Sequence, residues 1–297
     1  VLLQAIAAYQ AGVPMIFSAA FVRACGRVLQ GAENDPAFAA EALSLPGATT
    51  LAEHLSVIDP EAIHVARHGL RQTLARALRG AFDDAYRNSE VPAPYSPEPT
   101  AAGRRALRNV ALSYLMELDD PEIRHRCVRH FTTADNMTDA IAALTALANS
   151  PGDERVHALA MFYAKWESEP LVIDKWFTVQ ATSRLPDTLG AVRALCRHEA
   201  FELTNPNKIR ALIGAFCQAN HAAFHAGDGG GYWFAAEHVI ALDPINPQIA
   251  ARLARAFDRW RKFDAGRQAH ARAALEQIRD SSGLSKDTTE VVSRLLN

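Results

Sequence analysis

The sequence has none of the marks of a membrane-spanning or exported chain. No apolar run approaches the roughly 20 residues that cross a bilayer, and no basic start leads into an apolar stretch with a small-residue cleavage site. The 297 residues carry a formal net charge of −2, and such a balance does not favour nucleic acid or an anionic membrane as a main partner. We therefore expect a cytoplasmic chain that binds neither.

Cysteine is scarce, and no CxxC pair occurs in the sequence. The cysteines lie far apart in apolar, helix-like surroundings, so disulfides and zinc ligation are both disfavoured. We expect free, buried thiols in a reducing compartment. The four residues are Cys25, Cys127, Cys196 and Cys217.

Strand patterns are missing as well, because no stretch alternates apolar and polar residues between turn signals. Apolar residues instead recur at three- and four-residue spacing, as in the segment from Ala62 to Tyr86. Asx-Pro steps mark helix starts, since the Asx side chain caps the helix and proline suits its first position. These steps begin at Asp35, Asp59, Asp120, Asn205, Asp243 and Asn246.

Two details of these starts are specific predictions. The Asx-Pro steps on either side of Ile245 are too close for two helices, so one of them must be a turn. Asp187 follows Pro186 and is expected to cap a helix without a proline after it.

The helix pattern predicts an all-α fold, an irregular superhelix of antiparallel helix pairs similar to HEAT or armadillo arrays. No clean fixed-period repeat is visible. The proline-rich stretch 88–103 is the one long connection, and residues 1–297 are expected to form a single domain.

Complete catalytic motifs are absent. A zinc hydrolase helix needs two histidines four residues apart and a glutamate directly after the first, and no G-x-S-x-G nucleophile turn occurs. Three segments come close, and we interpret them as ordinary helical residues. His64–His68 and His221–His225 lack the glutamate, and His198–Glu202 lacks the second histidine.

The glycine run Gly227–Gly231 is not a phosphate-binding loop. A P-loop needs Lys-Ser/Thr after its last glycine, whereas Tyr232 and Trp233 follow here, and no predicted strand precedes the run. We predict a turn in which glycines adopt positive φ. Tyr232, Trp233 and Phe234 should then open the next helix and pack inward.

The most basic region lies in the helix predicted to begin at Pro247. One face of this helix would carry Gln248, Arg252, Arg255 and Arg259, while the opposite face is apolar. Arg261, Lys262 and Arg267 add charge nearby. The face is either simply solvated or binds an anion, which would be a phosphate backbone or a carboxylate gripped by arginine.

Several long motifs occur in a familiar order. They are DNMTDAIAAL (135–144), DKWFTVQATS (174–183), NPNKIRALIGAF (205–216), FHAGDGGGY (224–232), NPQIAARL (246–253) and FDAGRQAHARAALEQI (263–278). Together they closely resemble the C-terminal helical domain of the bacterial aminopeptidase N family, the zinc alanyl aminopeptidases of proteobacteria. DPAFAAEALSLPG and IDPEAIHVAR resemble the first third of that domain, so the resemblance covers essentially the whole chain.

The resemblance implies that the catalytic residues lie in another domain, upstream of this chain. In the family, an upstream catalytic domain carries HExxH, a distant glutamate ligand and a GxMEN loop, and none of these occurs here. The sequence already reads as helix from Val1 to Gln10, without an initiator methionine, as expected of a piece of a longer protein. The chain would be the last of four domains, with no catalytic residue, metal ligand or cofactor of its own and with zinc in the absent catalytic domain.

The resemblance also implies a role and partners. The domain would cap the active-site cleft, admit peptides and exclude folded proteins, so its partners would be its own catalytic domain and peptide substrates. By position in the matching motifs, Arg252, Gln248 and Arg210 are expected to line the substrate channel, where arginines attract the peptide's C-terminal carboxylate. Arg255 departs from the family pattern and is expected to lie only at the surface.

A hypothesis from another functional class stays open at this point. The chain would then be a stand-alone helical-repeat scaffold that binds a protein or nucleic acid through its basic helix face.

Overall fold

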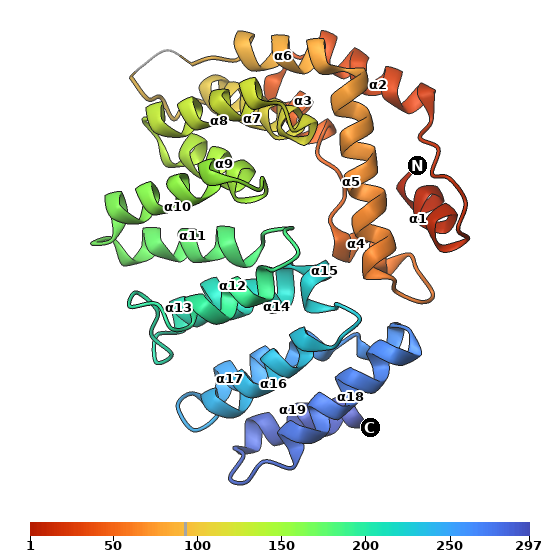
Figure 1. The fold of residues 1–297 in the computed structure, drawn as a ribbon, viewed down its shortest axis with the longest axis vertical. Helices are drawn as coiled ribbons and strands as arrows, with labels where there is room; N and C mark the ends of the chain where they lie inside the picture. Colours follow the sequence, from red (N-terminus) through yellow and green to blue (C-terminus); the bar gives the residue numbers. More distant parts are fainter. Residues whose placement is uncertain (92–93) are drawn as a thin grey trace. The chain divides into compact units, whose positions relative to one another are not determined.

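The structure is a computed structural model that describes residues 1–91 and 94–297, and helices make up its architecture (Figure 1). No β-strand occurs in these residues, and a single isolated parallel bridge joins Ile58 to Phe263. The all-α prediction is confirmed. None of the described helices is both long and apolar enough to cross a membrane.

The chain folds as two compact units, each of which contains two stretches of sequence. Unit 1 comprises Val1–Leu51 and Ala62–Met161, and unit 2 comprises Ala52–Glu61 and Phe162–Asn297. The expectation of one cap domain over residues 1–297 stays a prediction.

The first part of the chain, down to α10, provides most of unit 1. Its helices are α1 (Leu2–Gln10), α2 (Ala19–Gln30), α3 (Pro36–Ala42), α4 (Ala48–Glu53), α5 (Pro60–Ala77), α6 (Arg79–Asn88), α7 (Pro99–Leu115), η1 (Met116–Leu118), α8 (Pro121–Thr133), α9 (Met137–Ala148) and α10 (Asp153–Trp166).

The remaining helices belong to unit 2. They are α11 (Pro170–Ala181), α12 (Thr188–Leu195), α13 (Pro206–Ile209), η2 (Arg210–Gly214), α14 (Ala215–Ala219), α15 (His221–Phe224), α16 (Gly230–Leu242), α17 (Pro247–Ala254), η3 (Arg255–Phe257), η4 (Trp260–Lys262), α18 (Ala265–Arg279) and α19 (Lys286–Leu296).

Helix α7 is the centre of unit 1, where it packs against α3, α6 and α9. Leu107, Ala111 and Leu115 recur every four residues and are all buried, so one apolar stripe faces the core. Helix α3 crosses closely at Gly103, where an added Cβ would lie 3.1 Å from the Ala37 nitrogen.

Helix α16 plays the same part in unit 2, where it lies beside α17 and α18, while α19 packs on both of these (Figure 1). Most residues of α16 are apolar and buried, and Glu237 is its one exposed charged residue. Tyr232 and Phe234 are buried at its start and Trp233 is half-buried. The prediction that this aromatic segment packs inward is confirmed.

Four of the predicted Asx-Pro caps form hydrogen bonds to the first turn of their helices. Asp35, Asp120, Asn205 and Asn246 accept from the backbone N–H of Phe38, Glu122, Asn207 and Ile249 respectively. Asp243 belongs to the turn that the sequence required next to Ile245.

The carboxylate of Asp243 has a different partner, since it accepts from the backbone N–H and hydroxyl of Ser285, each at 2.6 Å. Asp187 precedes α12, but its side chain makes no capping hydrogen bond. The prediction that Asp187 caps this helix by itself is therefore wrong.

The long connection is shorter than predicted. Helix α6 ends at Asn88 and α7 begins at Pro99. Proline suits this first helical position, because its φ is already that of a helix and it gives up no hydrogen bond there. Part of the predicted connection, Pro92 and Ala93, lies outside the described residues.

The cysteines are free, as predicted, and three of them are buried while Cys196 is half-buried. Burial raises the pKa of the Cys127 thiol to about 12 and that of Cys196 to about 11. Thiols with such pKa values stay protonated at neutral pH and are poor nucleophiles.

Candidate functional site

The basic face predicted after Pro247 is divided by the end of its helix. Helix α17 stops at Ala254, and Arg255 and Arg259 lie in a following 3₁₀ turn and connection. The prediction that one helix carries Arg252, Arg255 and Arg259 is therefore wrong, because the helix ends before the last two. Arg255 pairs with Asp258 at 3.2 Å, and Arg259 pairs with Glu53 at 2.8 Å.

Arg252 and Arg210 both line a small cavity of about 70 Å³ in unit 2. The segment from α13 to α14 forms one wall and α17 forms the other. Apolar side chains make up most of the lining, and the guanidinium groups are its positive charges. The lining residues are Pro206, Ile209, Arg210, Gly214, Gln218, Ile249, Arg252 and Leu253.

The backbone at Arg210 is irregular, because Arg210–Gly214 form a π-helical turn between α13 and α14. Such turns carry an extra residue and frequently occur at functional sites. Both ends of this one, Arg210 and Gly214, line the cavity. The π turn was not predictable from the sequence, because no residue type or spacing in RALIG distinguishes it from an α-helix.

Lys208 anchors this segment to α11. Its ammonium lies 2.9 Å from the Asp174 carboxylate, donates to the Pro170 carbonyl at 2.8 Å and sits over the Phe177 ring. Lys208 is buried, whereas Arg210 is exposed. In the motif NPNKIR, Lys208 is therefore buried and holds the segment to α11, whereas Arg210 lies at the cavity. The sequence analysis did not predict this difference.

The two cavity arginines differ in their present contacts. Arg210 donates to the Asn207 side chain at 3.2 Å. Arg252 makes no ion pair or hydrogen bond with any residue in the described part of the chain. Gln248 is exposed in the first turn of α17 but does not line the cavity. Two guanidinium groups beside apolar walls are suited to a carboxylate attached to an apolar body.

The pair His64 and His68 has a structural setting in unit 1. The rings stack with centroids 6.3 Å apart, and His68 Nδ1 lies 3.1 Å from the Glu117 carboxylate. Glu117 also accepts from Arg71 at 2.6 Å. The imidazole of His68 is therefore engaged with Glu117.

His198 also has an engaged nitrogen. Its Nδ1 accepts from the Ala200 backbone N–H at 3.1 Å, and its ring packs on Tyr163 and Trp176. Glu202 accepts from the Thr204 hydroxyl. The side chains of His198 and Glu202 thus serve the local turn and the aromatic packing.

His225 is buried in unit 2 and His221 beside it is half-buried, with ring centroids 4.9 Å apart. His225 Nδ1 is 2.9 Å from the Tyr232 hydroxyl, while His221 Nδ1 is buried and makes no hydrogen bond to a described residue. Burial lowers the pKa of His221 to about 4, with Arg259 and Arg267 adding to the effect. Both histidines are held neutral by burial, and the pKa of His225 is lowered in the same way.

This setting predicts a pH-dependent stability. An unfolded histidine has a pKa of about 6.5, so between that value and about 4 the unfolded chain binds a proton that folded His221 does not. The contribution of His221 is present above the unfolded pKa and is lost as pH falls. The free energy of unfolding should fall by up to about 1.4 kcal/mol per pH unit for this residue.

Urea denaturation between pH 7 and pH 4.5 measures this loss. His221→Gln should reduce the slope of unfolding free energy against pH by about one proton, whereas His157→Gln, at an exposed position, should leave the slope unchanged. Equal slopes in the His221 variant and the unmodified chain would contradict the account.

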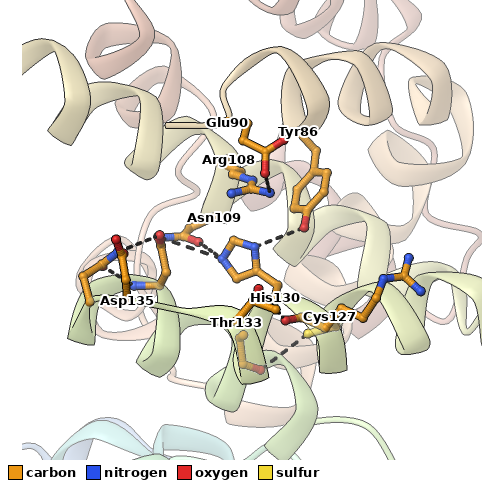
Figure 2. A network of polar contacts seen from close by, with 12 residues as sticks. Tyr86, Glu90, Arg108, Asn109, Cys127, His130, Thr133 and Asp135 are labelled. Atoms are coloured by element: carbon orange, nitrogen blue, oxygen red, sulfur yellow. Dashed lines mark hydrogen bonds and ion pairs between the residues drawn. The ribbon is translucent and has the colours of Figure 1, made fainter. Parts of the chain in front are cut away.

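Another buried histidine, His130, is the centre of a polar network in unit 1 (Figure 2). Its Nε2 lies 3.1 Å from Asn109 Oδ1, its Nδ1 lies 3.1 Å from the Tyr86 hydroxyl, and Asn109 donates to Asp139 at 2.8 Å. An amide oxygen only accepts, so Nε2 carries the proton and Nδ1 accepts from Tyr86. Burial, aided by Arg108, lowers the pKa of His130. The ring is neutral, with both nitrogens occupied, as befits a structural network.

No group of three His, Cys, Asp or Glu side chains within the described ranges is placed to hold a metal ion. The three histidine-containing segments therefore do not form a zinc site in the described part of the chain, since none of them brings a third ligand to its histidines.

Residues 1–297 match a family described as a domain of unknown function with ARM repeats, DUF3458_C. The chain belongs to this family. The repeats agree with the predicted armadillo-like class. The resemblance to the C-terminal helical domain of aminopeptidase N is confirmed by the similarities to individual proteins that follow.

Among similar proteins is aminopeptidase N of Escherichia coli strain K12, 39% identical over 291 residues, which are 98% of this chain and 33% of that protein. Aminopeptidase N of Caulobacter vibrioides is 39% identical over 276 residues, or 93% of this chain and 32% of that protein. The crystal structure of Legionella pneumophila aminopeptidase A in complex with aspartic acid matches with a TM-score of 0.90 and 29% identity, covering 99% of this chain and 35% of that one.

The DUF3458_C chain thus spans about a third of the length of its curated relatives. It corresponds to the C-terminal part of aminopeptidase N homologues.

Proposed function

We propose that this chain is the non-catalytic C-terminal domain of a zinc aminopeptidase that removes N-terminal residues from peptides. The domain covers the active-site cleft, limits entry to peptides and contacts the distal part of the substrate. Its partners are its own catalytic domain and peptides, and the zinc belongs to the catalytic domain. The protein works in the cytoplasm.

The observation that carries the substrate contact is the cavity between Arg210 and Arg252. A peptide held by its amino end at the zinc presents a carboxylate at its far end. Guanidinium groups attract this charge over a distance and can bind it with two parallel hydrogen bonds. Arg252 has no partner among the described residues, so a carboxylate would displace no existing ion pair. Gln248, which is exposed in the first turn of the same helix, would contact the peptide nearby.

The other arginines of the region argue against a nucleic-acid scaffold. Arg255, Arg259 and Arg267 each pair with a carboxylate, at 3.2 Å, 2.8 Å and 2.7 Å. Arg267 also donates to the His225 carbonyl. A phosphate backbone would have to compete with these pairs, and binding to phosphates is strongest where several free cations line up.

An assay of the isolated 297-residue chain tests the proposal. With an alanyl chromogenic amide and added zinc, we expect no hydrolysis above the buffer rate, since no zinc-binding set occurs among the residues that the structure describes. Robust, protein-dependent hydrolysis would contradict the non-catalytic role. In a parallel titration, salt-sensitive RNA binding at physiological ionic strength would favour the scaffold hypothesis instead.

A further inference from the structure

The π turn that begins at Arg210 leaves one of its carbonyl groups without the usual helical donor. In an α-helix the backbone N–H of Ala215 would donate to the carbonyl of Ala211, four residues back. Here this N–H donates to the carbonyls of Arg210 and Leu212 instead. Ala211 is buried, and a buried backbone carbonyl needs a hydrogen-bond donor from another source.

A side chain of α11 supplies that donor. The Thr178 hydroxyl lies 3.0 Å from the carbonyl oxygen of Ala211 and 2.9 Å from that of Asp174. A hydroxyl has a single proton to donate. The Asp174 carbonyl lies inside α11, where the helix already offers it the backbone N–H of Thr178. The carbonyl of Ala211 therefore depends more strongly on the hydroxyl proton.

Helix α11 holds the same segment at a second point, and it packs along the π turn. The Asp174 carboxylate pairs with the Lys208 ammonium at 2.9 Å, and residues four apart share one face of a helix. One face of α11 thus contacts the segment through Lys208, before Arg210, and through Ala211, after it. The backbone of Arg210 is fixed on both sides while its side chain lines the cavity.

The π geometry affects where the Arg210 side chain lies. Each residue of an α-helix turns by about 100°, so a return to α-helical geometry would rotate the residues before the turn by about that angle relative to those after it. Arg210 begins the turn, whereas Gly214, at its end, and Gln218 line the same cavity. Such a rotation would move the guanidinium away from the wall that Gly214 and Gln218 form.

We propose that Thr178 is a positioning residue for the carboxylate of the peptide substrate. Its hydroxyl replaces the helical donor that Ala211 lacks, stabilises the π turn and thereby keeps Arg210 at the cavity with Arg252. Thr178 acts through Arg210, since it does not itself line the cavity. This role rests on the proposed function, in which the cavity arginines bind peptide.

Steady-state kinetics of the full-length protein tests this role, with one hexapeptide supplied as a free acid and as a C-terminal amide. Thr178→Val removes the hydroxyl and should reduce the preference for the free acid about threefold, through KM, because Arg210 is displaced. The kcat for a small alanyl amide should be unchanged, which shows that the variant is folded. Thr178→Ser keeps the hydroxyl and should retain the preference to within about twofold.

Two further variants separate positioning from a general effect on the fold. Thr182→Val is the matched control, since the Thr182 hydroxyl donates at 2.8 Å to the Thr178 carbonyl inside α11 itself, and it should leave the preference unchanged. In an Arg210→Ala background, Thr178→Val should cause no further loss, because the residue that it positions is gone.

The outcomes distinguish this role from the proposed function. An undiminished preference in Thr178→Val, an equal loss in Thr178→Ser or Thr182→Val, or a further loss in the Arg210→Ala background would overturn the role of Thr178 and leave the carboxylate contact standing. If the unmodified protein shows no preference for the free acid, the carboxylate contact itself is contradicted, and the positioning role is contradicted with it.

Discussion

Gly231→Ala is expected to lower the free energy of unfolding by about 3 kcal/mol, among the largest effects of any single methyl group added to this chain. A Cβ at Gly231 would lie 2.1 Å from the carbonyl oxygen of Phe224 and 2.8 Å from its carbonyl carbon. These are backbone atoms of the preceding helix α15, and they cannot rotate away as the end of a side chain can. Either α15 or α16 must shift, which disturbs the packing of Phe224 and Tyr232.

Urea denaturation followed by circular dichroism measures this loss, and the same glycine run supplies a control. At Gly227 an added Cβ would find its nearest neighbour, an Arg267 nitrogen, at 3.8 Å, and the backbone φ is not positive. Gly227→Ala should therefore change the unfolding free energy by no more than about 0.5 kcal/mol. Equal losses in the two variants would show that the close approach of Gly231 to Phe224 is not what the fold requires.

The glycine run also shows which features of the fold could be predicted from the sequence and which could not. A turn with positive φ was predictable, and Gly229 adopts it with φ of 73°. The requirement at Gly231 was not, because it depends on how closely the backbone of α15 approaches α16. Local propensity reports the conformations a residue can adopt, whereas a close approach depends on tertiary packing.

The candidate site was likewise predictable only in part. Asn246 was a recognisable cap, so the start of α17 was predictable. Its end at Ala254 was not, since the next residues, Arg255 and Ala256, carry no glycine or proline signal. The prediction therefore extended one charged face too far, to Arg259.

The sequence predicted the two arginines of the cavity but not that they would line the same cavity. Arg210 and Arg252 were chosen by their positions in family motifs, and the fold places both beside one cavity. Their proximity depends on the packing of α17 near the π turn, and no spacing in a single sequence reports such a distance. Gln248 was chosen in the same way and lies outside the lining.

Arg252→Ala is the second substitution with a large expected effect, in the full-length protein that carries this chain. We expect kcat/KM for peptides of five or more residues to fall about tenfold, because a charge-assisted contact to the substrate carboxylate is lost. Hydrolysis of a small alanyl amide that lacks this carboxylate should be unchanged. Steady-state kinetics with both substrates measures the difference.

Arg255→Ala is the matched control for this experiment. It removes the same charge from the next helical turn, but Arg255 is exposed, pairs with Asp258 and does not line the cavity. Its kcat/KM values should equal those of the unmodified protein for both substrates. If the two variants behave alike, the effect is one of net charge and not of the cavity.

The central claim is that the cavity arginines bind the peptide's terminal carboxylate, and one pair of substrates tests it most directly. The full-length protein and its Arg210→Ala, Arg252→Ala double variant are given the same hexapeptide as a free acid and as a C-terminal amide. We predict that the unmodified protein prefers the free acid by about tenfold in kcat/KM, and that the double variant shows no preference. An undiminished preference for the free acid in the double variant would contradict the claim.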